Sequence, residues 1–551
     1  MDVDKTLNNL TINHASAVHK LSDSIDLAGN FKITVGEFQP NGRNLTVAGN
    51  TRIGPASGGA DQATLTCSSG NMSLGSGLTT DYGLTIVKGG TFVGGTGTHT
   101  MGSVFIDAFA DAKCTLTNGV TTLDGEDSGG YTWRNNGGTF AHNDGTVTTN
   151  SSVDTKIREN TFYNLIINQS SSGKFVYWED ISGNTCTVAN DLTITTGRLR
   201  GLVASDTVTV TGDVTVSADG TFNHTSVWTG SINHGSLTIA SGGTYNATSG
   251  TTTITGTSDA DWNWTNNGTF THNNGKVKFF TDSTSMEMWI SSGDTFYDLE
   301  TDSADAGGVY FYNNIIYGDL TVTDGPFHAY TTSATLTVHG NTYVKSEGQL
   351  LNGAAQSGTV TFHGLITNEG ILHSGSGTNN FNGGVRNLGT FTSDDTLTIG
   401  GTGGIIEGNL GSANVNVNLD PALVFDGTND YISIADDNDL DFGNDTFSVS
   451  MWIKTTQTTS TNAYLIHKAN DDAGSGDKWW GISLDSDEKV HFQVDDGSTA
   501  VQVLSSTVIN DGSWHHICAI YKESTNLRMY IDGVLETTTA HSSSLDTDTS
   551  S

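Results

Sequence analysis

Apolar residues alternate with threonine in short runs that end at glycine, asparagine or aspartate. Val208-Thr209-Val210, Leu237-Thr238-Ile239 and Leu397-Thr398-Ile399 are typical runs. A period of two puts one side chain on a buried face and the next on a face lined with hydroxyl groups, as in a half-buried β-strand. Strands this short become stable when the coils of a parallel solenoid stack about 4.8 Å apart. The pattern therefore predicts an all-β protein with an elongated parallel β-solenoid (β-helix) over residues 1–415.

A unit of about 130 residues is duplicated within this region. The run Trp133 to Asn143 is matched by the run Trp264 to Asn273, and later matches place the two copies at residues 131–260 and 262–390. With roughly twenty residues per coil, about 400 residues predict some twenty coils. A partial third copy opens the chain in mid-unit, so we expect the natural start of the protein to lie upstream.

Asparagine and glycine recur where each coil must turn, because both tolerate left-handed backbone conformations. The motifs N-N-G and N-G-G-T-F resemble those of filamentous-haemagglutinin-type and phage-fibre β-helices. The resemblance extends over about 1–415 and implies the same stacked parallel coils.

A second domain is predicted over residues 421–551, where aspartate becomes dense. Four motifs follow in order: Ala422 to Ile434, Asp445 to Lys454, Asp511 to Ala519, and Leu527 to Val534. This set resembles the laminin G-like, concanavalin A-like jelly-roll domain, which implies an antiparallel sandwich. The closing strands that this family has after its D-G hairpin do not follow here, so we expect the domain to be incomplete at its C-terminus.

Large apolar residues within these motifs are candidates for the core of the sandwich. Alternation with polar residues places Phe447, Val449, Met451 and Ile453 on one face. The residues predicted to build or border the core are Phe425, Phe447, Met451, Trp452, Trp514 and Tyr530.

The charge balance narrows the choice of partners. The chain has 551 residues, with 59 acidic against 23 basic side chains and a net charge of −36. Nucleic acid is not expected as a partner, because phosphate binding needs clustered Lys and Arg. No apolar run is long enough to cross a bilayer, so no membrane insertion is expected. The first residues show no secretory signal peptide.

The cysteines and histidines do not predict a disulfide framework, a metal site or a catalytic site. The four cysteines are widely scattered, which favours free buried thiols over disulfides or a metal site. His515 and His516 are adjacent in a predicted strand and therefore point to opposite faces. The recurring histidines His142, His224 and His272 are expected at equivalent corners, bonded to turn backbone.

Calcium is the one cofactor that the sequence suggests. Hard cations prefer several oxygen ligands from loops, and domains that resemble this one often hold Ca²⁺ in that way. The alternative, that scattered aspartates merely form a solvated surface, stays open. The candidate metal ligands are Asp426, Asp430, Asp436 and Asp437.

A ligand site is predicted in the segment 470–480. Lectin sites combine an aromatic ring that stacks on a sugar with short polar side chains that bond its hydroxyl groups. Adjacent tryptophans in a strand face opposite ways, so one packs inward while the other is presented outward. The candidate ligand-binding residues are Asp471, Asp472, Asp477, Trp479 and Trp480.

The sequence as a whole favours a non-enzymatic fibre or adhesin. A lectin-like domain on a β-helical stalk would present a binding surface for a glycan or another cell-surface ligand. The expected location is extracellular, on a cell surface or on a virion, and trimerisation of the rod stays open. One alternative is a carbohydrate-active enzyme, a polysaccharide lyase or glycosidase, with the jelly roll as a targeting module. The carboxylates of residues 1–420 are dispersed, which argues against catalysis. The other alternative is a purely structural rod.

Overall fold

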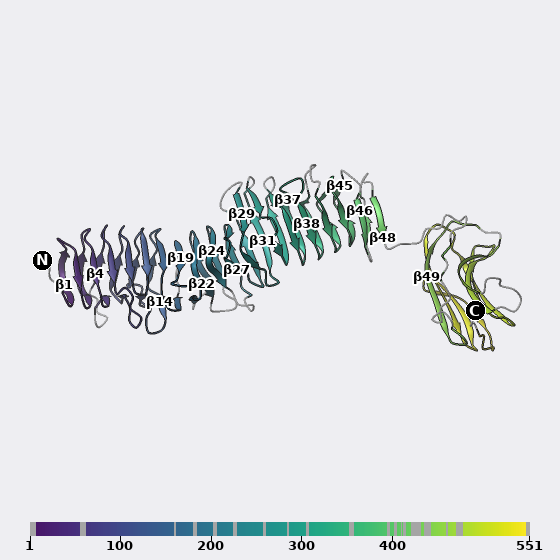
Figure 1. Ribbon diagram of the computed structural model, residues 1–551, viewed down its shortest axis with the longest axis horizontal. Coiled ribbons are helices and arrows are strands. Elements are labelled where there is room, and N and C mark those ends of the chain that lie inside the picture. The colour runs from purple at the N-terminus through teal and green to yellow at the C-terminus, as the bar shows by residue number, and fades with distance from the viewer. Residues whose placement is uncertain are drawn as a thin grey trace. The chain divides into compact units, whose positions relative to one another are not determined.

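The computed structural model describes most of the chain, which divides into two compact units, Met1–Pro421 and Ala422–Ser551. The first unit is an array of short stacked strands and the second is a sandwich (Figure 1). The described residues contain strands, turns and bends but no helix, and none of them could form an apolar membrane-spanning helix. The described residues are 7–55, 62–158, 161–179, 185–201, 207–223, 229–256, 261–283, 286–304, 308–351, 358–393, 397–401, 405–408, 410, 415–419, 431–432, 434, 442–458, 461–469 and 478–546.

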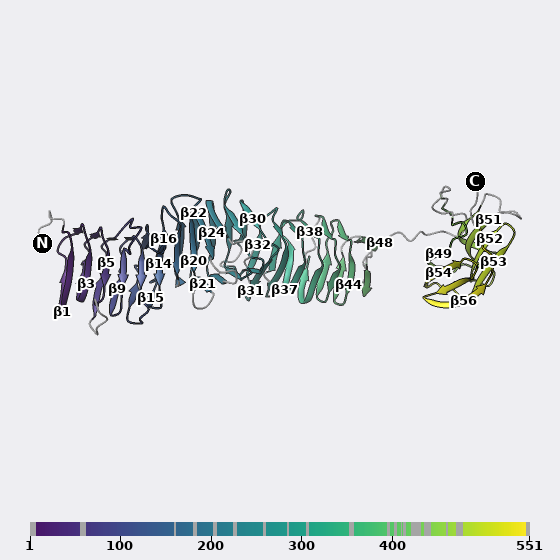
Figure 2. The same cartoon turned by 90° about the horizontal axis from the view of Figure 1, so that it is seen from below.

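The first unit is a parallel β-solenoid whose stacked strands are visible in Figure 2, and the strand pairings give it three faces. Each strand pairs in parallel with the strand on the same face of the next coil, as β14 does with β17. The strands of the first face are the N-terminal halves of β1 (Leu10–Lys20) and β3 (Phe31–Gln39), β5 (Thr51–Ile53), β8 (Leu84–Ile86), β11 (Val104–Ile106), β14 (Tyr131–Asn135), β17 (Thr155–Arg158), β20 (Phe175–Glu179), the C-terminal halves of β22 (Leu192–Gly201) and β24 (Val214–Asn223), β27 (Thr244–Asn246), β30 (Thr269–Thr271), β33 (Thr295–Phe296), β36 (Asn313–Ile316), β38 (Thr335–Val338), β40 (Val360–Phe362), β43 (Asn379–Phe381), β46 (Leu397–Gly401) and β48 (Val415–Leu419).

The other two faces are built in the same way. The second face has the C-terminal halves of β1 and β3, β6 (Ala63–Thr66), β9 (Gly90–Val93), β12 (Lys113–Thr115), β15 (Thr139–Ala141), β18 (Thr161–Phe162), β21 (Thr185–Val188), β23 (Thr207–Val210), β25 (Ile232–His234), β28 (Thr251–Ile254), β31 (Lys276–Thr281), β34 (Asp298–Ser303), the N-terminal halves of β37 (Leu320–Ala329) and β39 (Thr342–Leu350), β41 (Ile366–Asn368), β44 (Gly384–Asn387) and β47 (Ile405–Gly408). The third face has β2 (Ile25–Leu27), β4 (Leu45–Val47), β7 (Met72–Leu74), β10 (His99–Met101), β13 (Val120–Leu123), β16 (Thr146–Thr149), β19 (Asn164–Asn168), the N-terminal halves of β22 and β24, β26 (Leu237–Ile239), β29 (Asp261–Asn266), β32 (Glu287–Ile290), β35 (Gly308–Phe311), the C-terminal halves of β37 and β39, β42 (Ile371–Ser374) and β45 (Thr390–Ser393).

The solenoid makes about 16 turns over residues 10–393. The sequence predicts some twenty coils over about 400 residues. The strands β46 and β48 continue the first face beyond residue 393, and the remaining difference arises because several coils carry long connections. Ile53 pairs with Ile86, and Val104 pairs with Trp133, so these coils are much longer than the assumed twenty residues.

The two copies of the repeat start on different faces of the solenoid. In the first copy β14 follows β11 on the first face, whereas its counterpart β29 follows β26 on the third face. The repeated unit is therefore not a whole number of turns, and matching residues of the two copies face different directions.

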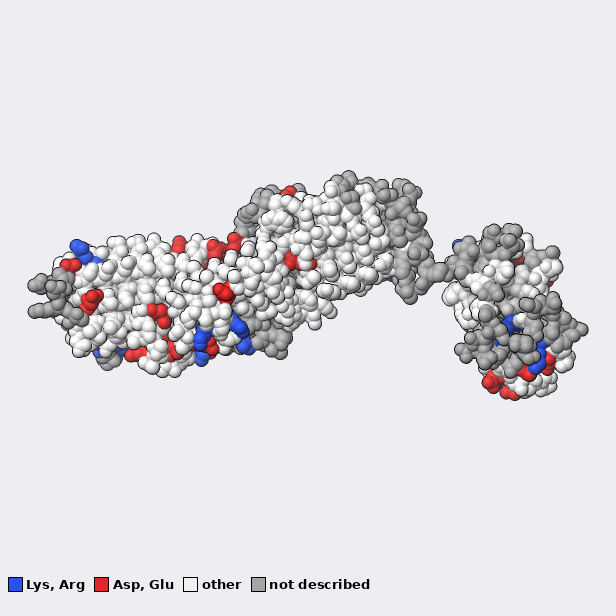
Figure 3. All heavy atoms as spheres, viewed as in Figure 1, with Lys and Arg blue, Asp and Glu red and all other residues white. Residues whose placement is uncertain are grey.

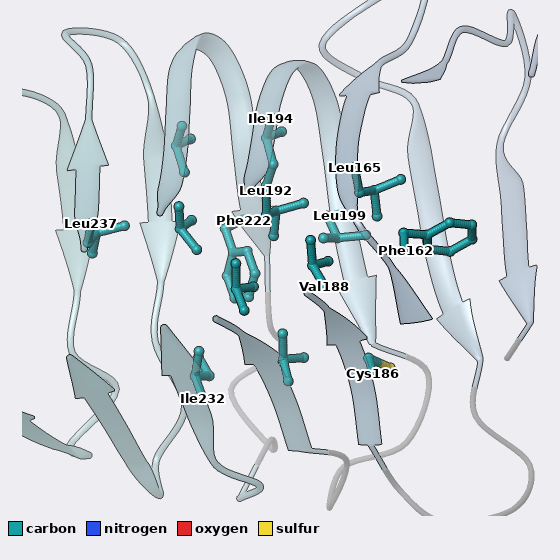
Figure 4. Close-up of a cluster of buried hydrophobic side chains, with 14 of the residues drawn as sticks. Phe162, Leu165, Cys186, Val188, Leu192, Ile194, Leu199, Phe222, Ile232 and Leu237 are labelled. Carbon is teal, nitrogen blue, oxygen red and sulfur yellow. The ribbon is translucent and has the colours of Figure 1, made fainter. Parts of the chain in front are cut away.

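The interior of the solenoid is one continuous apolar core. Figure 4 shows Phe162, Leu165, Val188 and Leu192 pointing into it from successive coils. None of the four cysteines forms a disulfide, as expected, and all four are described; three are buried in this core and Cys518 is half-buried in the second unit. Burial raises the pKa of the Cys67 thiol to about 12, so that thiol is inert.

Asn and Asp side chains tie the turns of successive coils together. The Oδ1 atom of Asp298 accepts a bond from the backbone N–H of Asp319 at 2.8 Å, and Asp319 does the same for Asn341 at 2.8 Å. Asn143 and Asn273 adopt left-handed conformations, with φ of 51° and 48°. The recurrence of Asn therefore reflects both turn geometry and bonds to the backbone of the next coil.

The second unit has two antiparallel sheets of four strands, in agreement with a jelly-roll sandwich. Its core includes Phe447, Trp480, Phe492 and Tyr521. One sheet has the order β49 (Phe447–Lys454), β54 (Trp514–Lys522), β55 (Asn526–Ile531) and β56 (Val534–Ala540). The other has the order β50 (Ala463–Lys468), β51 (Lys478–Leu484), β52 (Lys489–Asp496) and β53 (Ala500–Val508).

Two of the predicted core residues are on the surface. The prediction is wrong for Trp452 and Trp514, which are 64% and 51% exposed. In β49 the inward positions are those of Phe447, Val449 and Met451, so the alternation itself turns Trp452 outward. Phe447 is buried and Met451 packs against the core as expected, whereas Phe425 lies outside the described residues.

Candidate ligand-binding site

The two adjacent tryptophans of β51 face opposite sides of their sheet. Trp480 is 3% exposed and packs in the core against Phe442 and Phe447, with ring centroids 5.6 and 5.7 Å away. Trp479 is half-buried on the outer face. Of the two candidates, Trp479 alone is placed to meet a ligand.

Trp479 belongs to a cluster of three rings on the outer face of the sheet. Its ring lies 5.3 Å from His467 and 6.4 Å from Tyr464, both edge-to-face. His467 and Tyr464 come from the neighbouring strand β50 and stack on each other at 4.3 Å. Tyr464 is 52% exposed. We call Tyr464, His467 and Trp479 the aromatic platform.

A glycine gives the platform its shape. Gly481 pairs with His467 across the two strands, and a Cβ at this position would lie 3.0 Å from His467 Cδ2 and 3.5 Å from Tyr464 Cε1. Contacts near 3.0 Å are too short for an unperturbed side chain, so alanine would push the imidazole away. The absence of a side chain at Gly481 lets both rings lie over β51.

Polar side chains extend the same face beyond the rings. Asp495 pairs with Trp479, and Gln493 pairs with Gly481, in the neighbouring strand β52. Burial lowers the pKa of His467, so its imidazole is neutral at pH 7. The surface thus offers neutral rings beside an amide and a carboxylate, groups that can accept and donate bonds to hydroxyls.

The remaining candidate ligands of the sequence analysis are outside the described residues. This holds for Asp471, Asp472 and Asp477, which belong to the connection between β50 and β51, and for Asp426, Asp430, Asp436 and Asp437. In the described part of the chain, no group of three His, Cys, Asp or Glu side chains is placed to hold a metal ion. Calcium binding stays a prediction.

The opposite sheet carries a second exposed aromatic pair that the sequence analysis missed. Trp452 lies 5.1 Å from His516, whose Nε2 is 2.7 Å from Ser450 Oγ. The alternation in β49 was the signal that could have found this pair, since it turns Trp452 and Ser450 to the same outward face.

The histidines of β54 take separate roles, as their alternation predicts. His515 Nδ1 is 2.8 Å from Asp532 and its Nε2 is 3.1 Å from Asp511. The bond to Asp532, aided by Asp511, outweighs partial burial and raises the pKa of His515. The ring of His516 bonds Ser450 instead, so the two imidazoles share no partner, although Asp532 also accepts a bond from the backbone N–H of His516 at 2.8 Å.

The histidines at the solenoid corners also lie as expected. His142 Nδ1 accepts a bond from the backbone N–H of Asp144 at 3.0 Å, and His272 accepts one from Asn274 at 3.0 Å. His224 lies outside the described residues.

One group of polar side chains converges from three coils of the solenoid. Tyr131 donates to Glu179 at 2.5 Å, and Arg158 lies 2.7 Å from both Glu179 and the Tyr131 hydroxyl. Burial and Glu179 raise the pKa of Tyr131. Burial also acts to raise the pKa of Glu179, but bonds from Arg158 and Tyr131 outweigh it and hold that pKa low. Neither group is poised to exchange a proton near neutral pH.

Comparisons with known proteins bear on the second unit. Residues 426–551 match the family described as the concanavalin A-like lectin/glucanases superfamily. The solved structure of mouse laminin alpha1 chain, domains LG4-5, is similar at 19% identity and a TM-score of 0.17, over 19% of this chain and 26% of that one. The binding domain of Paraclostridial Mosquitocidal Protein 1 is similar at 17% identity and a TM-score of 0.18, over 21% of this chain and 30% of that one.

These alignments span about a quarter to a third of the solved chains. A search among curated proteins found no match. The family match over residues 426–551 identifies the C-terminal domain as laminin G-like and concanavalin A-like, and this domain follows a β-helical stalk.

Proposed function

We propose that this chain is a non-enzymatic fibre or adhesin whose lectin-type domain binds carbohydrate on the aromatic platform. The observation that carries the proposal is the three-ring cluster of Tyr464, His467 and Trp479 on an outer sheet face. The apolar face of a pyranose stacks on such rings, while its hydroxyl groups bond to side chains such as Gln493 and Asp495.

The stalk supports a role in presenting this surface. A rod built from about 16 stacked turns uses many residues to hold its two ends far apart. Such a rod is useful where a binding surface must be presented at a distance. The excess of 59 acidic over 23 basic residues favours solubility in saline surroundings. We therefore place the protein outside the cell, on a cell surface or on a virion, with a glycan or another surface ligand as partner. Trimerisation of the stalk is compatible with this role.

A glycan array probed with the full chain tests the proposal. We expect the parent to bind at least one neutral glycan, and Trp479→Ala to weaken that binding by about tenfold or more. Gly481→Ala should weaken it less, because it displaces His467 but keeps Trp479. Trp452→Ala is the matched control, since it removes an exposed tryptophan from the opposite sheet.

The outcomes separate the proposal from its alternatives. Parent-like binding by Trp479→Ala would move the site elsewhere, and loss only in Trp452→Ala would assign it to the opposite sheet. A chain that binds no glycan would agree with a purely structural rod. Repeating the assay with Ca²⁺ and with a chelator tests the predicted calcium site, because a loop ligand set would lose affinity on chelation.

A carbohydrate-active enzyme stays the alternative, although Tyr131 and Glu179, which converge with Arg158 from three coils, are not poised to exchange a proton near neutral pH. Product analysis after incubation with acidic and neutral polysaccharides tests it. Products formed by the parent and lost in Tyr131→Phe would replace the non-enzymatic proposal.

A further inference from the structure

One stretch of the solenoid is rich in cations, although the chain as a whole has few of them. Four of the eight arginines of the chain fall between residues 134 and 200, with Lys156 among them. Figure 3 shows a group of Lys and Arg side chains toward the middle of a solenoid surface that is otherwise mostly neutral or acidic. We call six outward residues of three successive coils here the cation–aromatic face: Lys156, Arg158, Phe175, Tyr177, Arg198 and Arg200. Glu179 also faces outward on β20, opposite Arg158.

Cations and rings alternate along the axis of the rod. Lys156 pairs with Tyr177, and Tyr177 pairs with Arg200 on the next coil. In the adjacent column Phe175 pairs with Arg198, whose guanidinium lies 5.2 Å from the ring. Phe175 and Tyr177 are themselves stacked at 5.4 Å. The face thus has one row of aromatic rings, on β20, between two rows of cations on the coils before and after it.

Three of these cations form no ion pair with a carboxylate of the described residues, although the charge of Lys156 acts at longer range on Glu126 and Glu179. Lys156 Nζ donates to the Gly129 carbonyl at 3.2 Å, and Arg198 Nε donates to the Ser172 carbonyl at 3.1 Å. Among the described residues, no Asp or Glu oxygen lies within 4.0 Å of the side-chain nitrogens of Lys156, Arg198 or Arg200. Arg158 differs, because it is paired with Glu179 at 2.7 Å. Within the described part of the chain, Arg198 and Arg200 are thus the cations least offset by carboxylates, and Lys156 is offset only at longer range.

The second copy of the repeat shows that the solenoid does not need these cations. Trp289 pairs with Tyr310, and Tyr310 pairs with His328, in the positions that match Lys156, Tyr177 and Arg200. That column keeps the rings and contains no Lys or Arg, yet it forms the same parallel ladder.

We propose that the cation–aromatic face binds an anionic polysaccharide, with its acidic groups on Lys156, Arg198 and Arg200 and its sugar rings against Phe175 and Tyr177. Successive coils lie about 4.8 Å apart, which is of the same order as one sugar residue in an extended chain. A polysaccharide with one acidic group on every sugar, or on every second sugar, would thus place its acidic groups opposite the cations of alternate coils. This site is separate from the aromatic platform and does not depend on it.

The overall charge favours a glycan over nucleic acid. Duplex DNA carries one negative charge per about 1.7 Å of its axis, so a chain with a net charge of −36 repels it strongly. An acidic glycan has a sparser charge and offers apolar ring faces as well. The local cations can then outweigh the long-range repulsion, which salt screens.

Titration calorimetry of the full chain tests the proposal, with polygalacturonate, dextran sulfate, neutral dextran and single-stranded DNA as probes. We expect binding of polygalacturonate or dextran sulfate that weakens as salt rises, and the two probes distinguish carboxylate from sulfate recognition. Arg198→Gln/Arg200→Gln should weaken it by about tenfold and flatten the salt dependence. Lys156→Gln is a milder second variant, should the double variant fold poorly.

A matched control comes from the second face. Lys276→Gln/Lys278→Gln removes the same number of charges, from lysines that pair with Glu300 and Asp302, and should leave binding within twofold. Equal losses in both double variants, equal binding of neutral dextran, or tighter binding of DNA would each overturn the proposal. Loss of the interaction in Trp479→Ala would overturn it as well, because the site would then belong to the C-terminal domain.

Discussion

A carboxylate buried in the solenoid wall should make the stability of the stalk depend on pH. Asp294 is 4% exposed and accepts bonds from Trp264 Nε1 at 2.9 Å, Ser291 Oγ at 2.6 Å and Asn266 Nδ2 at 2.6 Å. Burial raises the pKa of Asp294, and these three bonds counter it only in part. Trp264 itself is fully buried among the rings of Phe270, Phe279 and Phe296.

Trp264→Phe keeps an aromatic ring but removes one donor from this carboxylate. A hydrogen bond to a charged group contributes about 1.5–3 kcal/mol, so we expect a loss of that order at pH 7. Trp264→Ala should cost about 3–5 kcal/mol for the cavity, in addition to the lost bond.

The sign of the pH effect follows from the raised pKa. The contribution of Asp294 to stability is fully present below its unfolded pKa and is lost as the pH rises through its folded pKa. Removing the indole donor raises the folded pKa further. The penalty for Trp264→Phe should therefore be larger at pH 7.5 than at pH 4.

Urea unfolding followed by circular dichroism at the two pH values measures this effect. Asp294→Asn is the control background, in which Trp264→Phe should cost only about 0.5–1.5 kcal/mol at either pH because the acceptor is neutral. A penalty for Trp264→Phe that is the same at both pH values, or no penalty at all, would refute the reasoning.

Three further predictions concern the C-terminal domain. Trp514→Ala should change the free energy of unfolding by less than about 0.5 kcal/mol, whereas Trp480→Ala should cost about 3–5 kcal/mol, as urea titration would measure; comparable costs would contradict the assigned burial. The pKa of His515 is raised above 6.5, so the contribution of His515 to the stability of the fold is present below that value and is lost as the pH rises through the folded pKa. Asp532→Asn should therefore flatten the pH dependence of the unfolding midpoint. In the native chain only the half-buried Cys518 should react with a thiol reagent, and the other three thiols should react after unfolding; several fast thiols in the native state would contradict this.

The strand pattern was readable from the sequence because its period is local. Alternation in runs such as Leu237-Thr238-Ile239 identifies the buried residue of each strand without knowledge of its neighbours. The number of coils was not readable, because it depends on connections whose length follows no period. The same alternation predicts that one of Trp479 and Trp480 faces inward, without saying which of them, and it turns Trp452 outward, against the prediction that this residue belongs to the core.

The sites depended on contacts that no local pattern contains. The platform needs His467 opposite Gly481, which is a matter of antiparallel register between two strands. The cation–aromatic face needs Tyr177 opposite both Lys156 and Arg200, and therefore the length of two coils. Net charge gave the opposite expectation, since a total of −36 hides a local cluster of cations.

The fractional number of turns in the repeated unit also constrains how such a stalk can change in length. Because β14 lies on the first face and β29 on the third, gaining or losing one unit rotates every later side chain by one face about the axis. This rotation leaves the interior packing intact, since each coil still contacts the apolar residues of the coils before and after it. A surface site does change, because the direction in which it faces around the axis shifts each time a unit is gained or lost. Three successive gains would return the later side chains to their original faces. In a rod of this kind, a change in length therefore also changes the direction in which a surface site faces.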